Sequence, residues 1–321
     1  MSEQHSKTLP SIRNRALLVN LAFHKPPMTK TDWQATQDTE AKHNAKGGLR
    51  TQKMLYPKHM IAPIVAVEAE ARGYLRSNAI EWGASGMYLL DTSRYMEVRQ
   101  RLSEYELARS QEVTKFAQDW ANVLTQAEKQ QGDLFDPSLY PDVSSVVPQF
   151  TMSIFVAPMG DMAPDMFTDI EEELRARIRE DVEVATAEAV AGAVAQPLAR
   201  LLEAVLNLYD KTSRDKARIH DSIVDQVQEI AELMPSLNLL ELPQLDAIAR
   251  VCTGRLNVEG ETLRGKDNED NRKALAGDAE KLLKVCGVSA EDLRQAGDQK
   301  ARKHTAQKTA QTIVDRMEAF T

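Results

Sequence analysis

The chain of 321 residues has few aromatic side chains, two cysteines and no long apolar run. Aromatic residues make up 5% of it although 42% is hydrophobic, so aliphatic residues supply most of the apolar content. Together with abundant Glu, Gln and Arg, this composition favours helices. No apolar stretch approaches the roughly 20 residues that cross a bilayer, and the opening MSEQHSKTLP lacks the apolar segment of a signal peptide. We therefore expect a predominantly α-helical cytoplasmic protein without a membrane span.

The two cysteines lack the spacing of a metal site or a redox pair. Cys252 and Cys286 stand in separate helical segments, without a CxxC motif or a histidine at ligand spacing. Reduced, packed thiols are the expected state of such residues in a cytoplasmic protein, and a disulfide or metal pair is the alternative.

The motifs of common catalytic and metal sites are also missing. There is no GxxxxGK[ST], because Gly265-Lys266 is followed by Asp267, so Asp91 after an apolar stretch is interpreted as a helix cap rather than a magnesium ligand. The segment 83–86, Gly-Ala-Ser-Gly, lacks a spacer of the GxSxG elbow and is interpreted as a turn. The six histidines are scattered, with no HxH or HExxH.

Two acidic stretches are better explained as solvated surface. The loop 267–271 has Arg272 where a calcium loop needs glycine, and the carboxylates of 171–183 suit the positive end of a helix dipole. We therefore expect no metal, no cofactor and no enzymatic activity. A catalytic group assembled only by folding is the alternative, since a linear sequence does not show it.

Charge is distributed unevenly along the chain, whose formal net charge is -8. The first 60 residues contain ten Lys or Arg against four Asp or Glu, whereas the remaining 261 contain 30 against 44. Within the first part, residues 41–59 hold five Lys or Arg and two His and no acidic residue. A chain with one basic end suggests an anionic partner at that end.

This basic segment is the candidate interface, and nucleic acid is the candidate partner. Its cations suit phosphates, and Tyr56 and the more distant Trp33 suit stacking on exposed bases. The alternative is a solvated loop balanced by the acidic half of the same or another subunit. The candidate contact residues are Lys42, Lys46, Arg50, Lys53, Tyr56 and Lys58.

Two segments of the first half, residues 15–24 and 150–156, show the period-two alternation of strands, and the short apolar stretch 87–90 is expected as a further strand. Helical spacing lies between them, at about 31–46, from 63 until Gly83, and from 91 to 127. In the last of these helices, eight residues separate the apolar sets that end at Tyr105 and begin at Val113. We expect a small mixed sheet covered by helices.

The second half has helical patterns only. A long helix begins at the capping box 168–171, and its part 185–197 is nearly all small residues, which allow a neighbouring helix to approach closely. Pro197 predicts a bend or a helix pair, and Pro235 the end of the next helix. Further helices are expected at 243–252, 272–286 and 290–319.

These patterns predict an α+β, predominantly α fold in which a long-helix bundle follows the sheet. The expected domains are an α+β domain with the basic loop at 12–160, a long-helix region at 161–253, a solvated linker at 254–271 and C-terminal helices at 272–321.

Four segments follow one another within residues 14–160: RNRALLVNLAFHKPPMTKTD, GGLRTQKMLYP, NAIEWGASGMYLLDTSRYMEV and GDLFDPSLYPDVSSVVPQF. In this order of features, residues 14–160 resemble an uncharacterised family encoded by phages, conjugative elements and plasmids. Members of such families often lie near a MoxR-type AAA+ ATPase, a von Willebrand A-domain protein and recombination genes. The resemblance implies a mobile-element role in assembly or DNA metabolism and carries no catalytic residues.

Two functions follow as hypotheses. The first is a non-enzymatic protein that contacts DNA through the basic loop and forms homo-oligomers through its helical half. The second is a helical scaffold or adaptor for a AAA+ or A-domain partner, without direct nucleic-acid binding, whose faces are the small-residue helix 185–197 and the interrupted stripe at 105–113.

Overall fold

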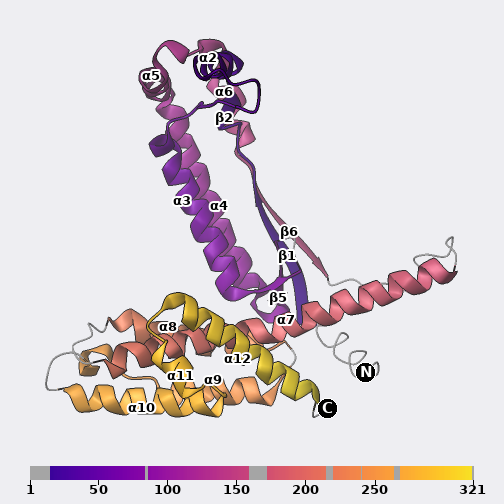
Figure 1. Cartoon of the computed structure of the whole chain (residues 1–321), viewed down its shortest axis with the longest axis vertical. Helices are drawn as coiled ribbons and strands as arrows, with labels where there is room; N and C mark the ends of the chain where they lie inside the picture. Colours follow the sequence, from indigo (N-terminus) through magenta and orange to yellow (C-terminus); the bar gives the residue numbers. More distant parts are fainter. Residues whose placement is uncertain are drawn as a thin grey trace. The chain divides into compact units, whose positions relative to one another are not determined.

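The computed structural model describes residues 15–83, 86–158, 172–214, 220–239, 241–263 and 268–319. The fold is α+β and predominantly α, with a small sheet and a helix bundle, as the sequence predicts. The chain forms two compact units. We call residues 20–77 with 96–155 the helix-pair unit, and residues 1–19, 78–95 and 156–321 the bundle unit (Figure 1).

Four strands form the larger sheet in the order β4-β5-β1-β6. The three predicted strands are present as β1 (Ala16–Phe23), β5 (Met87–Asp91) and β6 (Met152–Pro158). The sequence missed β4 (Ile80–Trp82), which is only three residues long and follows a helix directly. It pairs with β5 in an antiparallel hairpin, Ile80 opposite Leu89. The expected mixed sheet is wrong, because the sheet is antiparallel. Between β4 and β5 the short hairpin connection reverses the chain.

The β4 edge of the sheet is covered by a side chain of the bundle. Gln196 accepts a hydrogen bond from Glu81 N at 3.1 Å and donates one to Glu81 O at 3.2 Å. Its amide therefore makes both bonds that a neighbouring strand makes in a ladder. Arg200, one turn later, donates to Ala79 O at 3.3 Å.

Two helices lie side by side in the helix-pair unit (Figure 1). They are α3 (Lys58–Asn78) and α4 (Tyr95–Gln118). Asp119 separates α4 from α5 (Trp120–Gln131), so the single predicted helix of 91–127 is two helices preceded by a 3-10 turn. The unit also contains a two-stranded ribbon, β2 (Thr29–Thr31) with β3 (Gln52–Met54), and the short helices α2 (Trp33–His43) and α6 (Val143–Val146).

A buried ion pair interrupts the apolar stripes of both long helices. Arg109 is 3% exposed and fills the gap between the two apolar sets of α4. Its Nε and Nη2 lie 3.0 and 2.9 Å from Oε1 of Glu68, which is fully buried at an inward position of α3. Lys25, beyond β1, lies 2.7 Å from the other carboxylate oxygen.

The guanidinium of Arg109 makes further contacts that explain its burial. It donates to His24 O at 2.9 Å and lies 5.5 and 5.8 Å from the ring centroids of Phe23 and Phe150. Hydrogen bonds and aromatic faces together replace the water that a buried cation loses. The charges therefore join β1, α3 and α4.

The bundle unit is built around α7 (Glu172–Ser213). The helices α8 (Asp221–Leu237), α10 (Glu269–Val285) and α12 (Gln299–Ala319) pack against it, and α9 (Pro243–Arg255) packs against α8. The main core cluster includes Leu198, Leu202 and Val205 of α7, all fully buried. Ala193, Leu237 and Leu239 form a second cluster with Ala16, Ile80 and Leu89 of the sheet.

Several predicted boundaries are wrong. The helix pair, one of the two alternatives expected at Pro197, is wrong, since α7 continues through this residue as one helix. α8 likewise includes Pro235, because packing outweighs the single hydrogen bond that each proline removes. The predicted helix 290–319 is two helices, α11 (Ala290–Arg294), capped by Ser289 as expected, and α12. The capping box at 168–171 lies outside the described residues.

The predicted domain limits also need correction. Residues 78–95 belong with the helical half, so 12–160 is not one unit. The supposed solvated linker 254–271 places Leu256 and Leu263 fully buried in the main core, with a 3-10 helix at Gly260–Leu263. The helices after 272 pack on α7 and belong to the same unit. In each case, contacts between residues distant in sequence decided the outcome.

Candidate nucleic-acid interface

The start of the basic segment is fixed by helix capping. Asp32 accepts a hydrogen bond from Ala35 N at 2.9 Å and begins α2, as predicted. This bond, followed by the contact with Lys53, lowers the pKa of Asp32. α2 ends at His43, earlier than predicted, because Asn44 adopts a left-handed conformation with φ 52°. Lys42 therefore lies in the last turn of α2, where the helix dipole favours a cation.

The loop 44–51 is anchored at its far end. Thr51 N donates to Thr36 Oγ1 at 2.9 Å, and Asp32 N donates to Thr51 O at 2.9 Å. Gly47 and Gly48, earlier in the loop, have φ of 85° and 88°, which side-chain-bearing residues rarely adopt. The loop thus holds a defined path while Lys46 and Leu49 are exposed on it.

Four of the six predicted contact residues are exposed: Lys42, Lys46, Arg50 and Lys58. Within the part of the chain that the structure describes, none of the four forms an ion pair with a carboxylate. Arg50 is held by neutral bonds only, from Nε and Nη2 to Thr31 Oγ1 at 3.0 and 2.8 Å. Each of these cations therefore keeps its charge available to a ligand.

Lys53 and Tyr56 are not available in this way. The Lys53 side chain is 13% exposed, lies 3.2 Å from Asp32 Oδ2 and donates to Leu134 O at 2.8 Å. Tyr56 is 4% exposed, 5.8 Å from Phe116 and 5.9 Å from Trp120 between ring centroids, and burial raises its pKa. The sequence predicts both as contact residues because they lie in a basic segment, but both belong to the packing of the helix-pair unit.

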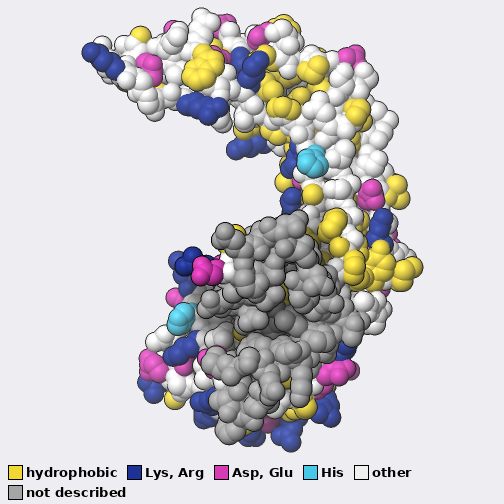
Figure 2. All heavy atoms as spheres, turned by 90° about the vertical axis from the view of Figure 1, so that its right-hand side faces the viewer, with side chains coloured by type: hydrophobic (Ala, Val, Ile, Leu, Met, Phe, Trp, Pro, Cys, Tyr) yellow, Lys and Arg dark blue, Asp and Glu magenta, His cyan; other side chains and the backbone are white. Residues whose placement is uncertain are grey.

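Exposed apolar side chains accompany the cations. Trp33, the first residue of α2, is 66% exposed, and Leu49 is 42% exposed. Lys30 on β2 is a further exposed cation that the sequence analysis did not single out. Lys30 stands opposite Lys53 in the ribbon. The pKa of Asp136 is lowered mainly by its hydrogen bonds with Ser138, and the charges of Lys53 and Lys30 lower it further. Figure 2 shows Lys and Arg side chains interspersed with apolar ones on the part of the helix-pair unit that carries α2.

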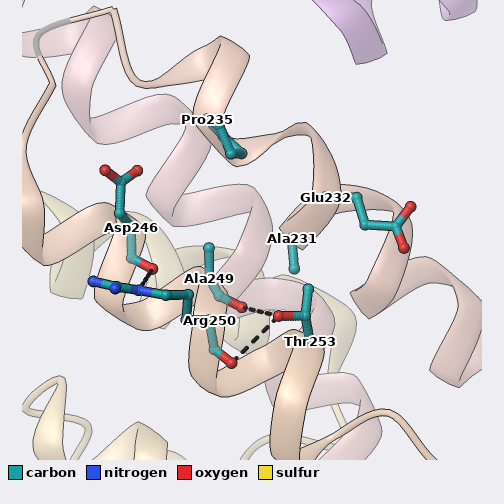
Figure 3. A pocket seen from close by; sticks show the side chains of 7 residues that line it. All are labelled: Ala231, Glu232, Pro235, Asp246, Ala249, Arg250 and Thr253. Atoms are coloured by element: carbon teal, nitrogen blue, oxygen red, sulfur yellow. Dashed lines mark hydrogen bonds between the residues drawn. The ribbon is translucent and has the colours of Figure 1, made fainter.

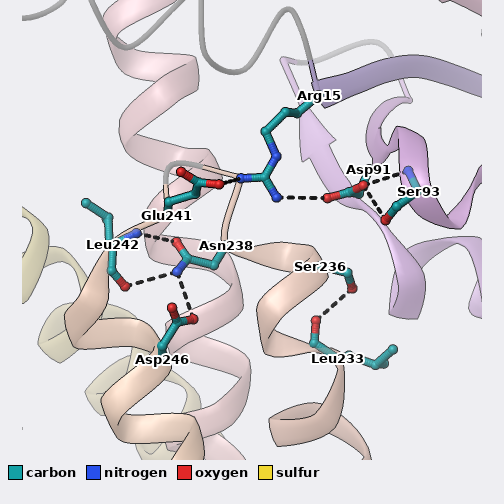
Figure 4. Close-up of polar contacts among 9 residues, drawn as sticks. All are labelled: Arg15, Asp91, Ser93, Leu233, Ser236, Asn238, Glu241, Leu242 and Asp246. Atoms are coloured by element: carbon teal, nitrogen blue, oxygen red, sulfur yellow. Dashed lines mark hydrogen bonds and ion pairs between the residues drawn. The ribbon is translucent and has the colours of Figure 1, made fainter.

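The other polar groups considered in the sequence are structural. Asp91 caps the 3-10 turn by accepting from Ser93 N at 2.8 Å, as predicted, and its other oxygen lies 3.4 Å from Arg15 (Figure 4). Arg15 also contacts Glu241 at 2.5 Å. Gly83 and Gly86 have positive φ at the β4–β5 turn, consistent with the predicted turn. No cluster of His, Cys, Asp and Glu able to hold a metal occurs among the residues with described positions.

A shallow depression of about 420 Å³ lies between α8 and α9 (Figure 3). Glu232, Asp246 and Arg250 line it with small residues. Arg250 Nε donates to Asp246 O one turn earlier at 3.3 Å, and Thr253 bonds likewise within its own helix. Arg250 and Thr253 therefore serve α9, and the Asp246 carboxylate accepts from Asn238, so these groups do not converge on a common point.

No helix in the described ranges is both long and apolar enough to span a membrane. The chain matches no protein-family model, no curated protein and no solved structure.

Proposed function

We propose that the protein is a non-enzymatic nucleic-acid-binding protein of the mobile-element type, which contacts phosphates through residues 42–58 and assembles through its helical half. The observation that carries the proposal is the set of four exposed cations, without carboxylate partners in the described chain, next to an exposed tryptophan. Cations release condensed counterions from nucleic acid, and an aromatic face stacks on bases.

The arrangement favours backbone contact over base reading. Lys42, Lys46, Arg50 and Lys58 lie on a helix end, a glycine loop, the approach to β3 and the start of α3. No single helix presents them as a row for the major groove, so binding with little sequence preference is expected. Trp33 adds a stacking surface that duplex DNA does not use, which favours single strands.

The decisive experiment is a salt titration of single- and double-stranded DNA binding by the wild type and a Lys42→Gln, Lys46→Gln, Arg50→Gln, Lys58→Gln variant. Loss of four phosphate contacts reduces the slope of log affinity against log salt by about 3 on single strands. A matched control replaces four exposed lysines of the bundle unit, Lys281, Lys300, Lys303 and Lys308, by Gln. Equal binding by the two variants, or none by the wild type at low salt, contradicts the proposal.

Trp33→Ala separates stacking from charge. Base stacking on an aromatic residue contributes about 1–3 kcal/mol, so affinity for single strands falls while the salt slope stays constant. Leu107→Ala, at a 62% exposed site of α4 outside the basic segment, is the control. A loss of duplex and single-strand affinity by the same factor contradicts a stacking role.

A helical scaffold for a AAA+ or A-domain partner is the second candidate function. Its predicted face at 105–113 lies inside the helix-pair unit, since Arg109 and Val113 are buried. What favours it is the first part of α7, which extends beyond the helices that pack on this helix (Figure 1) and carries the half-exposed Leu174. Co-purification with the neighbouring gene products tests this candidate.

A further inference from the structure

The strand β6 forms the edge of the four-stranded sheet opposite β4. It is seven residues long, and its residues are either exposed or half-buried. Among the residues whose placement is described, no strand or helix pairs with its outer side. Phe155 in its middle is 56% exposed, the only ring besides Trp33 among the exposed large apolar side chains of the described chain.

The two edges of the sheet differ in whether their backbone hydrogen-bonding groups are covered. On the β4 side, Gln196 occupies the backbone groups of Glu81. Strand edges of monomeric proteins are usually blocked by such a cover, by charged residues or by proline, because open edges pair with other chains. The sequence of β6, MSIFVAP, contains no charged residue, and its one proline stands at the very end.

The orientation of the β6 backbone can be assigned from one hydrogen bond. His24 N donates to Thr151 O at 2.8 Å, so the carbonyl group of Thr151 points to the β1 side, while its N–H donates to Gln149 O. Successive residues of a strand point these groups in opposite directions. The backbone groups of Ile154 and Val156 consequently face the open edge, where they present donors and acceptors to a neighbour.

We propose that this edge pairs with β6 of a second copy of the chain in an antiparallel arrangement, which joins two four-stranded sheets into one. Antiparallel pairing of a strand with itself obeys two-fold symmetry, the most common symmetry of protein dimers. Because β6 is uncharged, self-pairing brings no like charges together, whereas a charged peptide finds no complement on it. With the two-fold near Phe155, the two exposed rings lie next to each other and lose solvent contact.

The first test is the mass of the wild-type protein in solution, free of nucleic acid, by light scattering over about 1 to 100 µM. A dimer whose fraction increases with concentration is expected. A monomer throughout this range overturns the proposal. This holds also if the edge pairs with an extended segment of a different protein, because the purified chain is then monomeric.

The second test locates the contact. Phe155→Lys places two lysines next to each other at the two-fold and weakens dimerisation at least about tenfold. Met96→Lys, at a 75% exposed site of α4, makes the same chemical change away from the edge and leaves the dimer intact. If both variants dimerise equally, the interface lies elsewhere and the proposal is wrong.

A cross-link covers the case in which Phe155→Lys does not fold. Phe155→Cys brings two thiols to the distance at which antiparallel neighbours form disulfides, so oxidation yields a covalent dimer. Met96→Cys forms no covalent dimer under the same conditions, and the buried Cys252 and Cys286 do not compete. Equal cross-linking of the two variants, or none of Phe155→Cys in a protein that dimerises, overturns the assignment to β6.

Discussion

The bundle unit and the helix-pair unit bury their central helices in different ways. In α7, fully buried leucines and valines follow one another from Leu198 to Leu208, and the first buried charge, Asp210, comes at the end of this stretch. In α3 and α4, Glu68 and Arg109 stand in the middle of the buried stripes. Apolar spacing alone is therefore enough to find the first core, whereas the second depends on a charge pair that no spacing rule detects.

The largest effect is expected from breaking this pair. Glu68→Leu leaves Arg109 and Lys25 without their carboxylate, and removing one partner of a buried pair destabilises by about 3–5 kcal/mol. Urea unfolding followed by circular dichroism measures the loss. Glu70→Leu makes the same replacement at an exposed position of α3 and serves as the control.

A double variant shows how much of the stability lost in Glu68→Leu is due to the charge that is left buried without a partner. Glu68→Leu with Arg109→Met removes the pair and is expected to regain most of the stability, since apolar replacements of buried pairs are often neutral. If the double variant is as unstable as the sum of the single ones, the pair has no coupling and the assignment fails.

The corresponding change in the bundle unit is Leu202→Ala. A fully buried leucine replaced by alanine loses about 2–5 kcal/mol, through lost burial and the cavity that remains. Leu174→Ala, at a 51% exposed site of the same helix, is the control and changes stability by less than about 0.5 kcal/mol. Thermal unfolding distinguishes the two, and equal effects contradict the assigned core.

The bundle core also predicts a response to high pH. Burial raises the pKa of the Cys252 thiol to about 12 and that of Cys286 to about 11. Unfolded thiols ionise near a pKa of about 8.5, so below this pH both states are protonated and the thiols have no effect. Above it the unfolded state loses protons first, and stability decreases up to the folded pKa values.

Two measurements check this prediction. A Cys252→Ser, Cys286→Ala variant shows a smaller loss of stability between pH 8 and 10 than the wild type. Native protein reacts with a thiol reagent only as fast as it unfolds, because both thiols are free and buried. Rapid labelling at neutral pH without unfolding contradicts the burial.

The smallest effect is at a helix start that the sequence identified correctly. Ser289 accepts from Asp292 N at 3.2 Å in a capping box, and Ser289→Ala costs about 1 kcal/mol. Ser145→Ala, at an exposed position whose hydroxyl bonds no described group, is the control, and calorimetry resolves the difference.

The sequence predicted what depends on local periodicity and failed where distant segments meet. The strands around Val19, Leu89 and Ile154 and the cap at Asp32 follow from neighbours in the chain. The basic segment was found from composition, yet the burial of Tyr56 depends on Phe116 and Trp120, some 60 residues away. One feature of the sequence indicates the ion pair: a Glu and an Arg stand at positions that helical spacing places on the inward faces of two neighbouring helices.

The cover of the β4 edge has a consequence for synthesis of the chain. Glu81 receives its partner Gln196 from a position 115 residues later. On the ribosome, the hairpin β4–β5 emerges well before α7. Both edges of the sheet in a nascent chain are therefore exposed to other nascent chains during the seconds in which the intervening residues are translated. Slow translation or truncation before residue 196 is therefore expected to promote aggregation, which the complete chain avoids on the β4 side.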